Sequence, residues 1–193
     1  ISLLMLFSCT STSNHNPSFE SLTTSNVQID EKVPDPKGLR HFMDGQLLMN
    51  QGDFAMAIIE FQEALTLDPN VSAIHTAIAE SYWNLGKPKL SEKYLLIAIK
   101  NDPSDKQALQ MISDQYILEK KYSEATTYLK KLNYLYPDES RYIIALAELK
   151  KLNQEYKTAM ELYLKAYSLD SNRNELLETA GRFALQINDE ENA

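Results

Sequence analysis

Residues 45–69 read GQLLMNQGDFAMAIIEFQEALTLDP, in which the polar break Gln51-Gly52-Asp53 separates two apolar helical patterns. Counted from Gly38 onward, each pattern covers about 14 residues, which suits two short helices packed antiparallel. Asp68-Pro69 ends the second pattern, because the residue before a proline is disfavoured in the α-helical region. The stretch therefore predicts a helical hairpin.

The hairpin pattern recurs along the chain. Pro69, Pro103 and Pro137 lie 34 residues apart, and Ser171 takes the next place. Small residues in both helices and a large apolar residue in the second helix keep the same spacing. Because independent columns share one register, the sequence predicts four copies of one unit that stack around a common core. The columns contain Gly45, Ala79, Ser113, Ala147 and Gly181; Ala57, Ser91, Ala125 and Ala159; and Phe61, Leu95, Leu129 and Tyr163.

This unit resembles the tetratricopeptide repeat. The family signature is matched at Gly45, Leu48, Ala57, Phe61, Ala64 and Pro69, with departures at His41, His75, Pro88, Lys150 and Ser171. The resemblance implies an all-α fold, a right-handed α-α superhelix of four helix pairs plus a C-terminal helix. The repeats are expected at residues 38–71, 72–105, 106–139 and 140–173.

Residues 174–193 follow the fourth repeat and either cap the stack or begin a fifth repeat. The segment from Asn172 to Ile187 is amphipathic, which predicts one helix packed against the stack. The apolar residues expected to face inward are Leu176, Leu177, Ala180, Phe183, Ala184 and Ile187.

The first residues carry a different signal. The apolar run Ile1–Phe7, followed by Ser8 and Cys9, resembles the end of a bacterial lipoprotein signal peptide, so residues 1–9 are expected to be a truncated leader with Cys9 as the lipidated residue. Residues 10–37, rich in Ser, Thr and Pro, predict a flexible tether. Because Thr10 is not Asp, the resemblance implies the periplasmic face of the outer membrane. The alternative is that Cys9 is an inert thiol in a protein without an anchor, with a cytoplasmic location less favoured.

Composition excludes several functions. A net charge of −8 disfavours nucleic acid as a partner. One Cys and three scattered His cannot complete a four-ligand zinc site. His41 and His75 share a column, but no column of Cys or carboxylate residues accompanies it. We therefore expect these two histidines to pack in the fold and not to bind a metal. The sequence contains no phosphate-binding loop, dinucleotide fingerprint or nucleophile motif. We therefore expect no enzyme activity, no cofactor and no small-molecule substrate.

In the tetratricopeptide family the first helix of each pair lines a concave surface. That resemblance implies a groove mixing apolar and acidic side chains, with Trp83 as its main anchor unless it packs against the next repeat. The expected partner is a protein or peptide segment with apolar and basic residues. The carboxylate clamp of the chaperone-binding members is not expected, because Phe42, Gln46, Ala77, Gln107 and Met111 stand at its places without a cation. The groove is predicted at Phe42, Gln46, Met49, Asn50, Thr76, Glu80, Trp83, Asn84, Gln110, Asp114 and Ile117, continuing through Ile144, Glu148 and Lys151.

These features favour a non-catalytic, lipid-anchored adaptor of the bacterial cell envelope. Such an adaptor would assemble or scaffold a pilus, secretion, barrel-assembly or cell-wall machine through its groove. Two alternatives stay open: a soluble adaptor or regulator without a lipid anchor, and the repeat fragment of a longer enzyme.

Overall fold

The computed structural model describes residues 33–191, and this part of the chain is entirely helical apart from its connections. Cys9 and residues 10–32 of the predicted tether lie outside the described residues. Within the described range the helices are α1 (Pro36–Asn50), α2 (Phe54–Leu67), α3 (Ser72–Asn84), α4 (Pro88–Asn101), α5 (Lys106–Leu118), α6 (Tyr122–Leu135), α7 (Ser140–Leu152), α8 (Tyr156–Leu169) and α9 (Asn174–Glu191).

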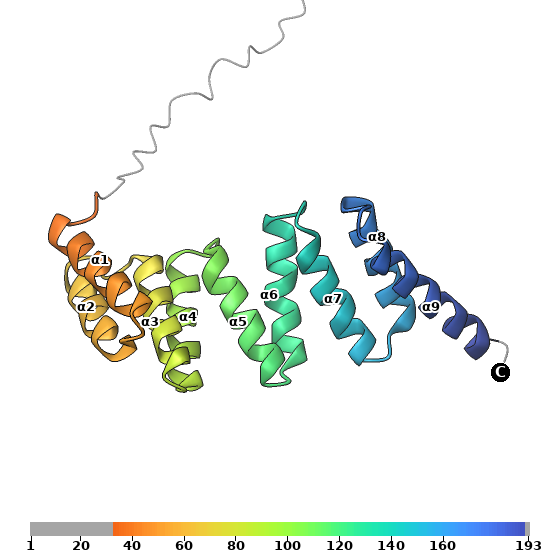
Figure 1. Cartoon of the computed structure of the whole chain (residues 1–193), viewed down its shortest axis with the longest axis horizontal. Coiled ribbons are helices and arrows are strands. Elements are labelled where there is room, and N and C mark those ends of the chain that lie inside the picture. Colours follow the sequence, from red (N-terminus) through yellow and green to blue (C-terminus); the bar gives the residue numbers. More distant parts are fainter. Residues whose placement is uncertain (1–32, 192–193) are drawn as a thin grey trace, which may run out of the picture. The chain divides into compact units, whose positions relative to one another are not determined.

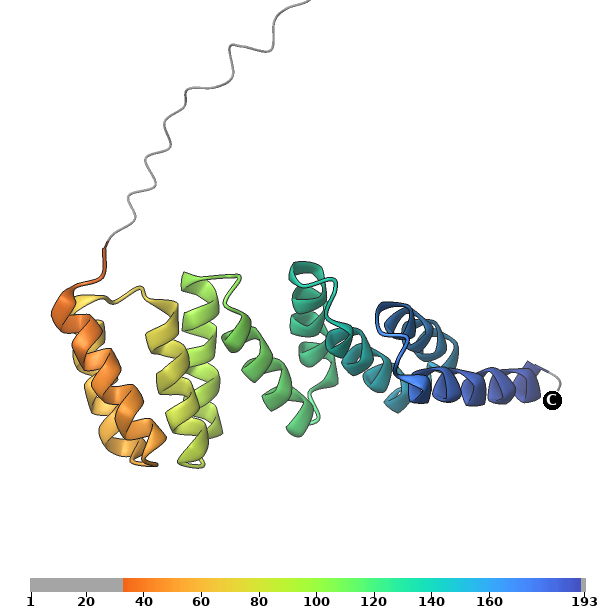
Figure 2. The same ribbon diagram turned by 45° about the horizontal axis from the view of Figure 1, so that its top comes forward.

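The helices pack as successive pairs. In residues 34–193, α1 packs on α2, α3 on α4, α5 on α6 and α7 on α8, and the second helix of each pair packs on the first helix of the next. The pairs follow one another in chain order, as both views of the ribbon show (Figure 1 and Figure 2). The prediction of an all-α helical-repeat solenoid is confirmed. Helix α1 begins at Pro36, two residues before the predicted start of the first repeat, because the Asp35 carboxylate caps it by accepting from Lys37 N at 2.8 Å.

Every hairpin uses the same turn. The residues at positions 52, 86, 120 and 154 all have positive φ, and the following N–H donates back to the carbonyl five residues earlier, as in Asp53 N to Leu48 O at 2.9 Å. Gly52 and Gly86 adopt this conformation without steric cost, whereas Lys120 and Gln154 adopt it with a side chain. The four polar breaks in the sequence are thus the four helix-to-helix turns.

The column of small residues sets the distance between the two helices of a pair. In the first repeat, a Cβ placed on Gly45 would lie 2.5 Å from Cε1 of Phe61, a side chain that is fully buried. The equivalent residues Ala79, Ser113 and Ala147 are buried as well. A larger side chain at this column would therefore force the helices apart.

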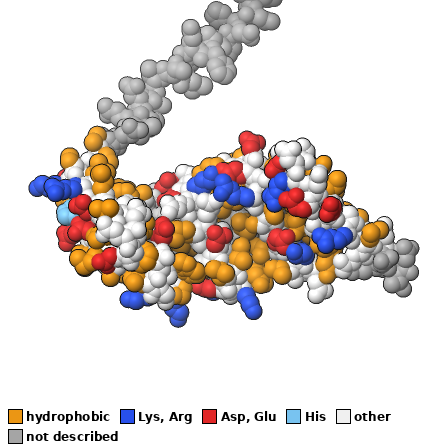
Figure 3. Space-filling view, in the orientation of Figure 1, with side chains coloured by type: hydrophobic (Ala, Val, Ile, Leu, Met, Phe, Trp, Pro, Cys, Tyr) orange, Lys and Arg blue, Asp and Glu red, His pale blue; other side chains and the backbone are white. Residues whose placement is uncertain are grey.

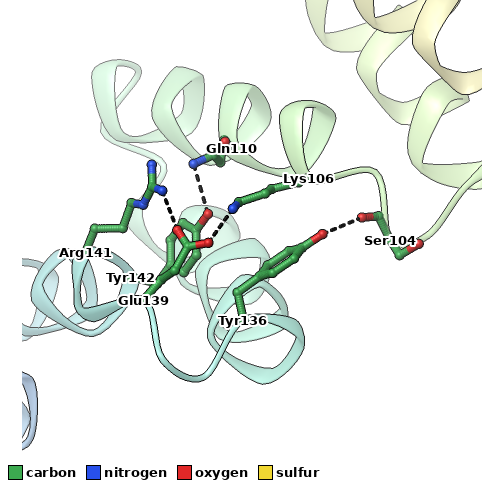
Figure 4. Close-up of polar contacts among 7 residues, drawn as sticks. All are labelled: Ser104, Lys106, Gln110, Tyr136, Glu139, Arg141 and Tyr142. Carbon is green, nitrogen blue, oxygen red and sulfur yellow. Dashed lines mark hydrogen bonds and ion pairs between the residues drawn. The ribbon is translucent and has the colours of Figure 1, made fainter. Parts of the chain in front are cut away.

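Polar contacts join neighbouring repeats beside the apolar core. Near the junction of the third and fourth repeats, Glu139 forms ion pairs with Lys106 and Arg141 (Figure 4). Tyr136 of the third repeat donates to the backbone carbonyl of Ser104 in the second repeat at 3.2 Å. The Lys106 ammonium also lies 4.4 Å from the centre of the Tyr136 ring. The hydrogen bond from Lys106 holds the pKa of Glu139 below its ordinary value, so Glu139 stays charged at neutral pH.

The first helix carries charges where later repeats are apolar. Arg40 and Asp44 form an exposed ion pair at 3.9 Å. The residues one repeat later, Ile74 and Ile78, are buried against the preceding pair. The outer face of α1 is therefore suited to water and not to another repeat.

Helix α9 packs on α8 along one side only. Leu176, Ala180 and Phe183 are buried, and the ring centroids of Phe183 and Tyr163 are 5.9 Å apart. The expectation that Leu177 faces inward is wrong, because this side chain is 46% exposed. The equivalent residues His75, Leu109 and Ile143 are buried in repeats two to four, and no helix in the described residues covers that side of α9.

Gly45 and Gly181 share a column but have different surroundings. A Cβ at Gly45 would meet the Phe61 ring, whereas no atom outside the local helix lies within 4 Å of a Cβ at Gly181. We expect Gly45→Ala to lower the free energy of unfolding by about 1–3 kcal/mol through overpacking against Phe61. Gly181→Ala should raise it by about 0.5–1 kcal/mol, because alanine favours the helix. Urea denaturation followed by circular dichroism measures both. Equal effects of the two substitutions would contradict this account of the column.

Candidate partner-binding groove

A cleft of about 380 Å³ lies between the first helices of the second and third repeats, α3 and α5. It brings together four residues of the predicted groove, Glu80, Trp83, Asn84 and Asp114. The remaining wall residues are Ser91, Gln107, Met111, Gln115 and Leu118. On the face seen in Figure 3, hydrophobic side chains lie beside acidic and basic ones, so the surface of the stack is chemically mixed.

Trp83 stands at the rim of this cleft near the C-terminal end of α3. The residue is 37% exposed, so part of its surface faces solvent while the rest is buried. Trp83 therefore offers a large apolar surface to a partner while still contacting the cleft. Asn84 beside it is less available than predicted, because its side-chain amide donates to Glu80 O at 2.9 Å.

The cleft is acidic. Glu80 accepts a hydrogen bond from the Gln107 amide at 3.0 Å, and no Lys or Arg belongs to the cleft lining. Asp114 is exposed overall, but the cleft walls remove part of the hydration of its carboxylate, which raises its pKa and destabilises the charged form. A positive group brought into the cleft would offset that cost.

Two polar residues at the floor of the cleft were not predicted. Ser91 of α4 and Gln115 of α5 are almost completely buried. The Gln115 amide nitrogen donates to Pro88 O at 2.9 Å and to the Glu119 carboxylate at 3.0 Å. Its oxygen Oε1 and the Ser91 hydroxyl have no hydrogen-bond partner among the described residues.

Sequence reasoning passed over both residues for identifiable reasons. Ser91 stands in a column of small residues whose role is close packing, and Gln115 lies outside the predicted groove columns. A signal was present, because Gln115 is a long polar side chain at a position where the neighbouring repeats hold Ser81 and Leu149, both buried.

Thr76 corrects the predicted groove. Only 1% of it is exposed, and its hydroxyl donates to the Asp105 carboxylate at 3.0 Å. Asp105 also accepts from Ser72 and caps α5 by accepting from Ala108 N. Thr76 therefore holds the second repeat to the third and does not reach a partner.

Several other predicted groove residues serve packing. Phe42 is half-buried, with its ring centroid 5.7 Å from that of Phe61, and Met49 packs on the same core. Ile117 packs on the central core, and the Gln110 amide donates to the Tyr142 hydroxyl at 2.9 Å, as Figure 4 shows. Of the predicted positions in the first repeat, Gln46 is half-buried and Asn50 is exposed, and neither lines the α3–α5 cleft.

A second cleft, of about 480 Å³, lies between α7 and α9 and has a different charge pattern. Glu148 there pairs with Lys151 and accepts from the Tyr163 hydroxyl. Burial raises the pKa of Glu148, but these two hydrogen bonds outweigh it and leave the pKa below its ordinary value. Arg182 also lines this cleft. The Glu148 carboxylate therefore already has positive charge beside it.

The two histidines of the first repeats have local partners. His41 Nδ1 lies 2.8 Å from the Glu60 carboxylate, and His75 Nε2 lies 2.9 Å from Pro69 O. The described residues bring no group of three His, Cys, Asp or Glu side chains together as a metal site. None of the helices in residues 33–191 has the length and apolar character needed to span a membrane.

The repeat pattern and this geometry agree with a comparison against protein families. Models described as tetratricopeptide repeat match residues 41–71 and residues 72–105. Residues 41–105 therefore match two tetratricopeptide repeats. This repeat is typical of non-catalytic scaffolds for protein interaction, and no curated protein matches the chain.

Solved structures share the fold. MamA 41-end from Desulfovibrio magneticus RS-1 aligns with a TM-score of 0.68 and 16% identity, over 83% of this chain and 90% of that one. The Pseudomonas aeruginosa pilF structure aligns with a TM-score of 0.62 and 21% identity, over 79% and 70%. The first tetratricopeptide repeat domain of Spaghetti (RPAP3), bound to the HSP90 peptide SRMEEVD, aligns with a TM-score of 0.55 and 23% identity, over 64% and 98%.

The raised pKa of Asp114 gives a prediction of stability against pH. Because the folded-state pKa lies above the unfolded one, the charged form costs stability at neutral pH, and the cost disappears as the pH falls below both values. We expect Asp114→Asn to stabilise the protein at neutral pH and to have no such effect near about pH 3, below the ordinary pKa of an aspartate. Urea denaturation at both pH values measures the difference.

Asp138→Asn, in the exposed connection between α6 and α7, is the matched control and should show little difference between the two pH values. A stabilisation by Asp114→Asn that persisted unchanged in acid would contradict the electrostatic explanation.

Proposed function

We propose that this protein is a non-catalytic adaptor that binds a segment of another protein in the cleft between α3 and α5. The observation that carries the proposal is the combination of an exposed Trp83 with two carboxylates, Glu80 and Asp114, in one cleft without a lining cation. The segment has apolar side chains for Trp83 and at least one basic residue for the carboxylates.

The fold supports this proposal. Stacked helical repeats present extended binding surfaces along their first helices, and both clefts described above lie between first helices. A structural neighbour, the RPAP3 domain, is seen with a bound peptide. That peptide is acidic, whereas the cleft here is itself lined by acidic residues. The proposed partner segment is therefore basic and not acidic where it enters this cleft.

We further propose that the adaptor works in the bacterial cell envelope, anchored to the outer membrane through a lipid on Cys9 and facing the periplasm. The basis is the sequence alone: an apolar run ending at Ser8-Cys9, followed by a segment rich in Ser, Thr and Pro. On this proposal the adaptor would assemble or scaffold an envelope machine. A soluble adaptor with the same groove is the second candidate, because the described residues that line the cleft all belong to the helical repeats.

The groove is tested by replacing its anchor. Trp83→Ala should weaken binding of a captured envelope protein by about 2 kcal/mol or more, roughly thirtyfold in Kd, if Trp83 carries the contact. Tyr134→Ala is the matched control, because Tyr134 is an exposed aromatic residue outside the cleft. The measurement is a pull-down from envelope extract, followed by calorimetric titration of each recovered protein. A folded Trp83→Ala protein that retains every partner at unchanged affinity would refute the groove.

The anchor is tested separately. Cys9→Ser should release the protein from the membrane pellet to the soluble fraction, because serine cannot carry the thioether-linked lipid. Its far-ultraviolet circular dichroism should be unchanged, since Cys9 lies outside the helical repeats. Fractionation of cells producing each form, with mass spectrometry of the mature N-terminus, gives the result. A Cys9→Ser protein that stays in the membrane pellet would refute the lipid anchor on Cys9, whereas a wild-type protein found in the soluble fraction would favour the soluble adaptor.

A further inference from the structure

The two clefts along the first helices carry surplus charge of opposite sign. The α3–α5 cleft has two carboxylates, Glu80 and Asp114, and no Lys or Arg among its lining residues. The α7–α9 cleft has two cations, Lys151 and Arg182, and a single carboxylate, Glu148. Its lining therefore has a surplus of one positive charge, although the whole chain has a net charge of −8.

The carboxylate of the α7–α9 cleft has its partners within the protein. Glu148 forms an ion pair with Lys151 and accepts a hydrogen bond from the Tyr163 hydroxyl. Both partners belong to the folded stack, Lys151 to α7 and Tyr163 to α8. Glu148 therefore gains little from a cation of a ligand, unlike the two carboxylates of the α3–α5 cleft.

Arg182 is the cation that remains. Its guanidinium donates to the Thr179 hydroxyl at 3.1 Å, and it forms no ion pair with a carboxylate of the described residues. The residue is exposed, so a ligand can reach it. Thr179, Arg182 and Gln186 are three and four residues apart, which places them on the side of α9 that lines the cleft. The planar fork of a guanidinium matches the two oxygens of a carboxylate.

We propose that the bound segment carries an acidic side chain as well as a basic one, and that it lies with the acidic side chain at Arg182 and the basic one at Glu80 and Asp114. This inference rests on the function proposed above and adds a direction to it. A surplus of one positive charge is balanced by a single carboxylate, whereas a phosphate group would exceed it. An acidic side chain reaches between α7 and α9 while the backbone of the segment continues along the first helices.

The spacing of the first helices sets the distance between the two charged side chains of the segment. The α3–α5 and α7–α9 clefts are separated by one further interval, between α5 and α7. Neighbouring packed helices lie about 10 Å apart, which places the clefts about 20 Å apart. An extended segment rises about 3.3 Å per residue, so about six residues separate its basic and acidic side chains.

The probes are ten-residue peptides with both ends blocked and one shared neutral sequence that includes apolar residues. The mixed peptide has Lys at the second position and Glu at the eighth, and is also made in the reverse order. The dibasic peptide has Lys at both positions, and the monobasic peptide has Lys and Gln. Each is titrated into the full chain and followed by the fluorescence of Trp83, the single Trp.

The tighter of the two mixed peptides should bind at least about tenfold more tightly than the dibasic peptide, because its carboxylate pairs with Arg182 and a second lysine there is repelled. The net charge of the chain works in the opposite direction, since a charge of −8 favours the dibasic peptide. The comparison therefore separates a local contact from general attraction.

Arg182→Gln removes the surplus cation. It should weaken the mixed peptide about tenfold and leave the monobasic peptide within about twofold, because that peptide has no carboxylate. Arg173→Gln is the matched control, since Arg173 lies outside the cleft and already pairs with Glu175 at 2.8 Å. It should leave both affinities within about twofold. Far-ultraviolet circular dichroism checks that both variants fold.

Nitroxide-labelled mixed peptides test the direction. A label at the basic end should broaden the nuclear magnetic resonance signal of the Trp83 indole. A label at the acidic end should broaden the backbone amide signals around Arg182. The reverse pattern would overturn the inference, as would a dibasic peptide that binds as tightly as the mixed one, or an Arg182→Gln protein that binds the mixed peptide as tightly as the wild type does.

The outcomes separate this inference from the broader one. If the dibasic and mixed peptides bind equally and Trp83→Ala weakens both, the adaptor function stands and only the acidic contact at Arg182 fails. If Trp83→Ala changes neither affinity, the groove itself fails. No measurable binding of any peptide would count against the groove and its direction together.

Discussion

The close approach of two helices at one small residue in each repeat is the constraint on which this structure depends. In the first repeat the missing Cβ of Gly45 is the space that the ring of Phe61 occupies. Because α1 and α2 then share one core, the apolar sides that remain can be buried only by the next pair. Repeating that contact every 34 residues stabilises the stack, sets the order in which the pairs pack and aligns the first helices that form the clefts.

The same regular scaffold positions chemically different sites. Both clefts lie between consecutive first helices, yet Glu80 and Asp114 have no cation in their cleft, while Glu148 is paired with Lys151. The backbone therefore decides where a cleft forms, and individual side chains decide what it binds. A carboxylate that is already paired gains little from a ligand cation, whereas a partly desolvated and unneutralised one gains more.

The fold was predictable from sequence to a greater extent than the site. Proline spacing and small columns specify helix ends and contacts through local sterics, so the four turns and the stacking order could be predicted. The direction of a side chain within a packed stack depends on its neighbours. The repeat pattern alone predicts Thr76 in the groove, whereas its hydroxyl donates to the Asp105 carboxylate. Gln115 escaped notice because its unpaired oxygen is a property of the assembled cleft and not of any single helix.

The two ends of the stack are chemically unlike, and this gives the solenoid a direction of growth. A repeat added ahead of α1 would bury the Arg40–Asp44 pair, and the desolvation of two charges would cancel much of the gain from stacking. A helix added after α9 would meet Leu177 and the open space beside Gly181, the surface that second helices cover in the other repeats. A further helix is therefore better accommodated against the open side of α9 than against the charged face of α1.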